Sequence, residues 1–186
     1  MTVPSLKTRR LVLRPLIRDD AVLFSKYASD PDIACMTGSF PLPYPVYSVE
    51  GLIDIFAAQA VTGQAYHWAI TLDGNFIGAL GVTRTDQGWS FGYWIAKPFW
   101  NQGYSSEAVE AVISHMAAVD PTATLLACVF TDNPASRRLL EKFGFSNTGA
   151  VAPSYSVARD AKFPVHHYCL DLAGVAGAHG QKEAAE

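Results

Sequence analysis

Three strand-like stretches, joined by tight turns, lead directly into a glycine-bearing helix entry, and this succession restricts the fold most. Residues 66–72 and 75–83 flank Asp73-Gly74, a strong hairpin signal because both turn positions tolerate positive φ. A third stretch, residues 89–96, follows after another short turn. Strands joined by such short connections pair antiparallel, whereas parallel strands need a long crossover. The chain therefore lacks the alternating strand and helix order of a doubly wound sheet.

Residues 99–108, which read FWNQGYSSEA, contain a glycine-bearing turn and the start of a helix. The first turn of a helix has backbone N–H groups without intrahelical partners, and the helix dipole makes that end partly positive. Gly103 lets an anion approach the backbone, while Ser105 and Ser106 cap the helix or donate to a phosphate oxygen. The stretch predicts a phosphate-binding site, with an ordinary helix entry as the alternative interpretation. It lacks a P-loop lysine, so γ-phosphate transfer is not expected.

The charge balance and the cysteines restrict the class of protein. The 14 Lys and Arg against 17 Asp and Glu leave a net charge of −3, which indicates no nucleic-acid partner. The three cysteines, Cys35, Cys128 and Cys169, lie far apart and form no C-x-x-C motif. The sequence also shows no apolar signal region and no run of about 20 apolar residues that would span a bilayer. We therefore expect a cytoplasmic protein without a membrane partner.

The periodicity of the remaining residues predicts further elements. Strands are expected at 10–14, 125–130, 145–151 and 165–172, and helices at 19–30, 48–63, 104–118 and 133–144. The intervening residues 30–48 are rich in proline and aromatic residues, and form either a substrate-side loop or a plain connector. We expect one domain over residues 1–172. The tail over residues 173–186, rich in alanine and glycine and then charged, is expected to be disordered.

Three motifs now stand in a fixed order: Gly-Tyr-Trp-Ile at residues 92–95, the helix entry at 100–108, and Asn-Pro-Ala-Ser opening the stretch 133–145. Together they resemble the GNAT superfamily of acyl-CoA-dependent N-acyltransferases. Residues 6–16 are similar to the opening of its RimJ/RimL-like branch, the ribosomal-protein N-acetyltransferases. The resemblance covers residues 5–172, and the combined pattern is specific although each motif alone is not.

The resemblance implies a single α+β domain. Its mostly antiparallel seven-stranded sheet is expected to be splayed between the fourth and fifth strands and flanked by about four helices. It further implies that acetyl moves from acetyl-CoA, without a metal, to a primary amine by direct attack in a ternary complex. The acceptor is then a protein N-terminal α-amine or a small-molecule amine, with residues 40–47 and 155–163 shaping its pocket. The family resemblance also favours a homodimer.

Several residues depart from the family pattern. Trp100 stands where the phosphate-binding signature begins with Arg or Gln, Asn101 replaces a common glycine, and Ser105 replaces a final Gly or Ala. Leu140 stands where many relatives carry a tyrosine general acid, so that acid is expected to be absent. The missing tyrosine, and the missing carboxylate in residues 89–96, favour the alternative of a non-catalytic acyl-CoA-binding module. A nucleotide-binding protein of unrelated function is a further alternative.

The resemblance also implies which residues contact acetyl-CoA. The diphosphate is expected on the backbone amides of the helix entry, and the pantetheine arm on the free edge of the strand before it. The expected coenzyme-binding residues are Trp94, Ile95, Ala96, Asn101, Gln102, Gly103, Tyr104, Ser105, Ser106, Asn133, Ser136 and Arg137.

Catalytic roles are expected for a smaller set. The Ser136 hydroxyl can stabilise the leaving thiolate, and its alternative role is to cap its own helix. Glu107, His67 and His166 are candidates for a base or a water-positioning group. Their alternative roles are compensation of the helix dipole for Glu107 and simple packing for the histidines. The backbone N–H of Ile95 is expected to polarise the thioester oxygen.

Overall fold

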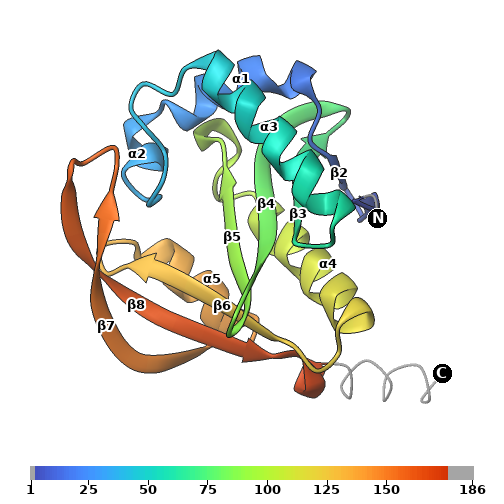
Figure 1. Cartoon of the computed structure of the whole chain (residues 1–186), viewed down its shortest axis with the longest axis vertical. Helices are drawn as coiled ribbons and strands as arrows, with labels where there is room; N and C mark the ends of the chain where they lie inside the picture. Colours follow the sequence, from blue (N-terminus) through green and yellow to red (C-terminus); the bar gives the residue numbers. More distant parts are fainter. Residues whose placement is uncertain (1–2, 176–186) are drawn as a thin grey trace.

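The strands form one sheet in the order β1-β2-β3-β4-β5-β6-β8-β7 in the computed structural model, which describes residues 3–175 (Figure 1). The strands are β1 (Leu6–Lys7), β2 (Leu11–Pro15), β3 (Ala65–Leu72), β4 (Asn75–Thr85), β5 (Gly88–Ile95), β6 (Thr124–Phe130), β7 (Ser146–Ser156) and β8 (Ala161–Asp171). The predicted α+β class is confirmed, but the described sheet has eight strands rather than seven. The addition is β1, whose two residues are too few to show a period in the sequence.

The predicted helices are all present, with one addition. The helices are α1 (Ala21–Ala28), α2 (Pro31–Ala34), α3 (Val46–Val61), α4 (Tyr104–Val119) and α5 (Pro134–Lys142), with 3-10 turns η1 (Arg18–Asp20) and η2 (Lys97–Phe99). Helix α2 lies inside the predicted loop, and Asp30 caps its N-terminus because its side chain accepts the Asp32 N–H at 2.9 Å. Residues 172–175 are helical, and residues 176–186 of the predicted tail lie outside the described residues.

Helices cover both faces of the sheet. Trp68 and Ile70 of β3 pack in the apolar cluster that includes α4, whereas Ala69 between them packs in the cluster that includes α1 and α3. Successive strand residues point to opposite faces, so the two clusters lie on the two sides of the sheet (Figure 1). Among the described residues, no helix combines the length and the apolar composition needed to cross a bilayer.

The sheet divides between β5 and β6. These strands run parallel and pair only at Trp89↔Leu125 and Ser90↔Leu126, and all the other paired strands are antiparallel. Beyond Ser90 the two strands diverge, and Figure 1 shows the resulting V-shaped gap between their ribbons. The predicted splay between the fourth and fifth expected strands is therefore confirmed. Helix α4 follows β5 and helix α5 follows β6, so both helix entries come close to the gap.

Candidate active site

The N-terminus of α4 has an uncapped first turn. Gly103 precedes it with φ of 80°, Asn101 has φ of 59°, and no side chain caps the helix. The amides of residues 104–106 belong to the first turn and have no intrahelical acceptor. They lie beside a pocket of about 190 Å³. Its lining residues come from this turn and from α5: Phe99, Asn101, Gly103, Tyr104, Ser105, Ser106, Ala135 and Leu139.

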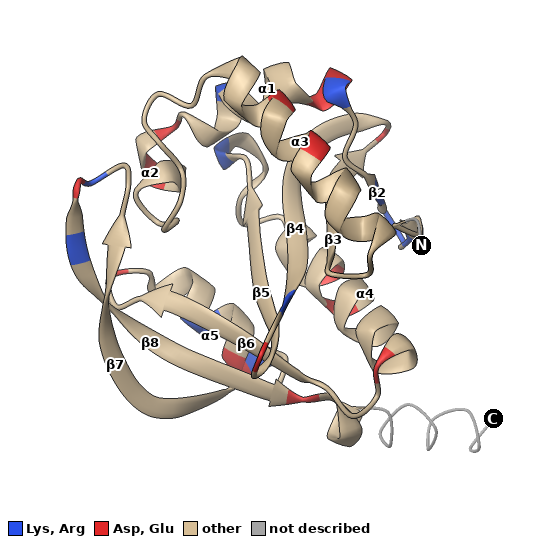
Figure 2. Cartoon of the chain, viewed as in Figure 1, with Lys and Arg blue, Asp and Glu red and all other residues tan. Residues whose placement is uncertain are grey.

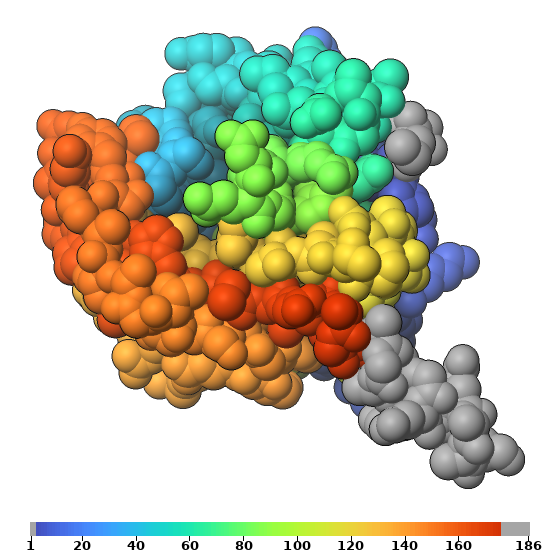
Figure 3. Space-filling model, turned by 60° about the horizontal axis from the view of Figure 1, so that its bottom comes forward, coloured from blue at the N-terminus to red at the C-terminus, as the bar shows by residue number. Residues whose placement is uncertain are grey.

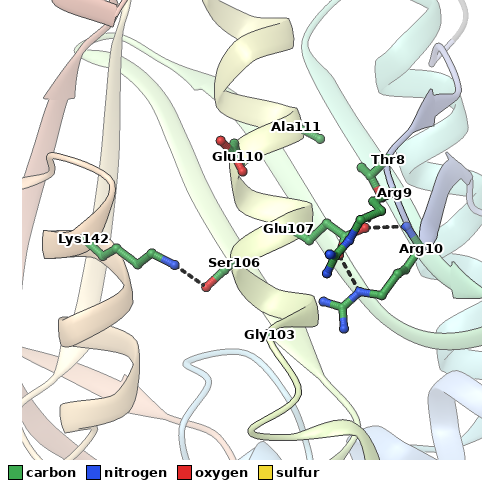
Figure 4. A pocket seen from close by; sticks show the side chains of 9 residues that line it. All are labelled: Thr8, Arg9, Arg10, Gly103, Ser106, Glu107, Glu110, Ala111 and Lys142. Atoms are coloured by element: carbon green, nitrogen blue, oxygen red, sulfur yellow. Dashed lines mark hydrogen bonds and ion pairs between the residues drawn. The ribbon is translucent and has the colours of Figure 1, made fainter.

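Basic side chains surround a larger groove of about 520 Å³ on the other side of the same turn (Figure 4). The groove is lined by Thr8, Arg9, Arg10, Gly103, Ser106, Glu107, Glu110, Ala111 and Lys142. In Figure 4, Lys142 reaches in from α5 and donates to Ser106 Oγ at 3.2 Å, while Arg9 and Arg10 reach in from the opposite side. Cations beside free helix amides suit an anionic ligand. Sequence reasoning did not identify Arg10 or Lys142, since only the tertiary fold brings them here.

Glu107 joins the turn before β2 to α4. Its carboxylate accepts from the Thr8 hydroxyl and the Arg10 N–H, both at 2.6 Å, and from Arg10 Nε at 2.7 Å. Burial raises the pKa of Glu107, but the hydrogen bonds from Thr8 and Arg10 outweigh it and leave the pKa below its usual value. Arg10 also donates to the Gln102 carbonyl at 2.9 Å and lies over the Tyr104 ring. Glu107 is therefore an ionised group with occupied acceptors.

The backbone of β5 presents alternate residues to the gap. The Ala96 N–H donates to the Ile77 carbonyl at 2.8 Å, and Ala79 pairs with Trp94, so the even-numbered residues bond to β4. The backbone groups of Tyr93 and Ile95 point instead to the side of β6, which is no longer paired at this level. The Ile95 carbonyl accepts from Trp100 Nε1 at 2.6 Å, while its N–H remains directed into the gap.

The Trp94 side chain does not reach the coenzyme side. Its ring packs against Phe24 at 4.9 Å between centroids, in the cluster of α1 and α3. Ala96 is fully buried. For both residues the side chain and the backbone point away from the gap. They lie beside the predicted coenzyme site but direct no group into it.

Helix α5 begins next to the gap. The Asn133 side chain accepts the Ser136 N–H at 3.1 Å and caps the helix, and Pro134 occupies its first turn. Ser136 Oγ lies 2.8 Å from the Tyr93 hydroxyl of β5. Burial raises the pKa of Tyr93 to about 12, although the Ser136 hydrogen bond opposes this shift. Arg137 is exposed and lies 3.9 Å from Glu141, one turn further along the helix.

The structure separates the predicted histidines from the gap. His67 lies on β3, stacked on Phe56 with 3.4 Å between ring centroids, and its Nε2 lies 3.2 Å from Thr83 Oγ1. His166 lies on β8, one strand away from the gap, opposite Val129. Ser136, Glu107, His67 and His166 therefore do not converge on one point.

The buried state of His67 has a consequence for stability. Burial lowers its pKa from 6.5 to about 4, so the unfolded chain binds a proton first as the pH falls. The contribution of His67 to the free energy of unfolding is complete above pH 6.5 and is lost progressively as the pH falls toward 4. We expect about 2 kcal/mol of this loss between pH 7 and pH 5, measured by urea unfolding. The variant His67→Gln should lack this part of the pH dependence, and a wild-type dependence equal to that of the variant would contradict the assignment.

Residues 40–47 and 155–163 are the segments expected to shape the acceptor pocket. The loop aromatics Phe40 and Tyr44 are buried in the α1 and α3 cluster, so they contribute core rather than pocket wall. The β7–β8 hairpin tip meets the same loop, where the Val157 N–H donates to the Gly38 carbonyl at 3.1 Å. In Figure 3, gold atoms of β6 lie at the base of a hollow between this orange hairpin and the green β4–β5 turn. Figure 2 shows that β5 and β6 carry no charged side chain.

Comparison with known proteins gives consistent results. A family model described as acetyltransferase (GNAT) domain matches residues 10–146. The uncharacterized N-acetyltransferase YoaA of Bacillus subtilis is 31% identical over 157 residues, which cover 80% of this chain and 86% of that protein. The uncharacterized N-acetyltransferase p20 of Bacillus licheniformis is 26% identical over 171 residues, which cover 89% of this chain and 95% of that protein.

Solved structures share the fold at lower identity. RimL, a ribosomal L7/L12 α-N-protein acetyltransferase in complex with coenzyme A, has a TM-score of 0.80 at 15% identity, over 91% of this chain and 99% of RimL. RimJ of Mycobacterium smegmatis, in complex with a CoA disulfide, has a TM-score of 0.77 at 22% identity, over 97% of this chain and 95% of RimJ. The microcin C7 self-immunity acetyltransferase MccE, in complex with acetyl-CoA and AMP, has a TM-score of 0.76 at 14% identity, over 88% of this chain and 93% of MccE.

Proposed function

Because the chain belongs to the GNAT acetyltransferase family, as an acyl-CoA-dependent N-acetyltransferase, we propose that it acetylates a primary α-amine by direct attack in a ternary complex. The observation that carries the proposal is the uncapped first turn of α4, which opens on one side to a pocket and on the other to a basic groove. The family membership speaks against the two alternatives, a non-catalytic acyl-CoA-binding module and an unrelated nucleotide-binding protein.

The residues around this turn fit the phosphates of the coenzyme. The amides of residues 104–106 are free donors at the positive end of a helix, and Gly103 has no Cβ in front of them. Arg10 and Lys142 supply positive charge on either side. The remaining predicted contacts, Asn101, Gln102, Asn133 and Arg137, stay part of the proposal.

The gap between β5 and β6 fits the arm that carries the thioester. The backbone groups of Tyr93 and the N–H of Ile95 face it without a strand partner, as a peptide-like arm requires. The Ile95 N–H is the donor that we propose for the oxygen of the thioester carbonyl, where negative charge develops during attack.

An α-amine suits a site in which the two strands that border the gap carry no charged side chain. Its pKa near 8 leaves a useful neutral fraction at neutral pH, whereas a lysine amine near 10.4 needs a strong base. Neither β5 nor β6 supplies a carboxylate, and Glu107 is held by Arg10 and Thr8. RimL and RimJ, named above, support a protein N-terminus as the acceptor, while MccE leaves a small-molecule amine as the second choice.

The test is an acetyl-CoA turnover assay that follows the release of free thiol. The acceptors are short peptides with a free N-terminus and an internal lysine, the same peptides with a blocked N-terminus, polyamines and aminoglycosides. We expect turnover with free N-termini and none with the blocked peptides. Turnover that survives blocking would contradict the α-amine assignment. Coenzyme binding by calorimetry without turnover on any amine would contradict the catalytic proposal.

A further inference from the structure

We propose that Tyr93 is a positioning residue of the acetyl transfer, and that its hydroxyl orients the Ser136 hydroxyl toward the sulfur of the thioester. The inference rests on the proposed function, and it adds a residue from β5 to the machinery at the entry of α5. The family resemblance implies a role for Ser136 and the absence of a tyrosine at Leu140, but it implies no role for a tyrosine on β5.

Tyr93 reaches across the point where the sheet divides. Its ring packs against the cluster that contains α4, on the opposite face of β5 from the neighbouring Trp94. Its hydroxyl lies 2.8 Å from Ser136 Oγ and 3.4 Å from the Ser136 carbonyl oxygen. Strands β5 and β6 are no longer paired at this level. The two hydroxyl groups therefore form a side-chain bridge between β5 and α5, the helix that follows β6.

A serine hydroxyl rotates freely, and its hydrogen takes the direction that its neighbours leave open. Asn133 accepts the Ser136 N–H and fixes the backbone, but this contact does not orient Oγ–H. The phenol of Tyr93 stays protonated at neutral pH, because burial raises its pKa to about 12. In our proposal it donates to Ser136 Oγ, so the serine hydrogen points away from the ring and into the gap.

The acetyl transfer needs no proton from Tyr93. The amine nitrogen forms a bond to the carbonyl carbon, the carbon–sulfur bond breaks, and its electron pair stays on the sulfur. The amine loses one proton to water, and the products are an amide, a thiolate and that proton. The oriented Ser136 hydroxyl donates a hydrogen bond to the sulfur as its negative charge grows. Tyr93 acts only through Ser136.

A purely structural bridge makes a different prediction from a positioning role. The variants are Tyr93→Phe, Ser136→Ala and the double variant, with Tyr168→Phe as the matched control. Tyr168 also donates its hydroxyl to α5, to Glu141 Oε1 at 3.1 Å, but within the described part of the chain it forms no hydrogen bond with Ser136. A structural role would make Tyr93→Phe resemble Tyr168→Phe, with a change in stability and none in kcat.

We expect Tyr93→Phe to lower kcat about 10-fold, the effect of one lost hydrogen bond, with KM for acetyl-CoA changed less than about twofold. In the Ser136→Ala background the same substitution should lower kcat by less than about twofold, because the group it orients is gone. Losses that multiply in the double variant, or an unchanged kcat in Tyr93→Phe, would overturn the proposal.

A second measurement needs no acceptor and separates this inference from the proposed function. The ultraviolet absorbance of the thiolate reports the pKa of coenzyme A bound to the protein, against roughly 8.5 for an ordinary thiol. We expect the bound thiol to titrate about one pH unit lower in the wild type and in Tyr168→Phe than in Tyr93→Phe and Ser136→Ala. Identical titrations in all four proteins would refute the role of Tyr93, even if turnover is found. A difference without turnover on any amine would refute only the proposed function.

Discussion

Replacing Gly103 with aspartate should raise the Kd for acetyl-CoA by at least about 100-fold, because it places a carboxylate where the diphosphate is expected to bind. A Cβ at this position lies 3.3 Å from Arg10 Nη2 and next to the free amides of α4. The new carboxylate would accept hydrogen bonds from the Arg10 guanidinium and from the free amides of α4, and it would repel the phosphates. Aspartate is chosen because it tolerates this backbone conformation, as Asp73 and Asp160 do here with φ of 49° and 46°.

The matched control is Gly74→Asp. Gly74 has the same φ of 80°, but a Cβ there meets no atom within 4 Å. Both substitutions carry a similar backbone cost, on the order of 1 kcal/mol, so loss of folding stability is expected in both variants. Calorimetry with coenzyme A should then show weakened binding in Gly103→Asp alone. Equal affinities in the two variants would mean that the diphosphate binds elsewhere.

The substitution Glu107→Ala should lower the free energy of unfolding by about 3 kcal/mol. The substitution leaves the Thr8 hydroxyl, the Arg10 N–H and the half-buried Arg10 guanidinium without their common acceptor. Because the folded-state pKa of Glu107 is lowered, its contribution is complete above the unfolded pKa and is lost as the pH falls through the folded one. Urea unfolding at pH 7 measures the loss.

Glu110→Ala is the control for this prediction. Glu110 is exposed on the same helix and lines the same groove, and no ion pair involves it among the described residues. Its removal should change stability by less than about 0.5 kcal/mol. A loss in Glu107→Ala no larger than in Glu110→Ala would show that the contacts with Arg10 and Thr8 contribute little.

Local sequence signals predicted the turns and helix starts that depend on the conformational preferences of their own residues. Asp73 and Gly74 adopt the positive φ values of the predicted turn, and Gly103 and Asn133 open helices at the expected places. Elements that depend on pairing alone were missed or misjudged. The two-residue β1 has no period of its own, and β7 extends to Ser156, five residues beyond its expected end, since its mostly exposed residues give little alternation.

The site was predictable where it follows from the backbone of one segment. The helix entry and the free edge of β5 are such features. Arg10 and Lys142 were missed because they meet the entry through tertiary contacts; Arg10 and Glu107, for example, are 97 residues apart. Burial, which makes His67 a neutral packed residue, is likewise a property of the fold and not of the residue type. The contact between Tyr93 and Ser136 could not be predicted either, because the tertiary fold sets the distance between β5 and α5.

The proposed diphosphate site at α4 and thioester site at β5 are tested most directly by an NMR titration of the backbone amides with acetyl-CoA. We expect the largest shifts at the amides of Tyr104, Ser105 and Ser106, with a further large shift at Ile95, since these are the proposed donors to the diphosphate and the thioester. Saturable binding that leaves these four amides unchanged would contradict both sites.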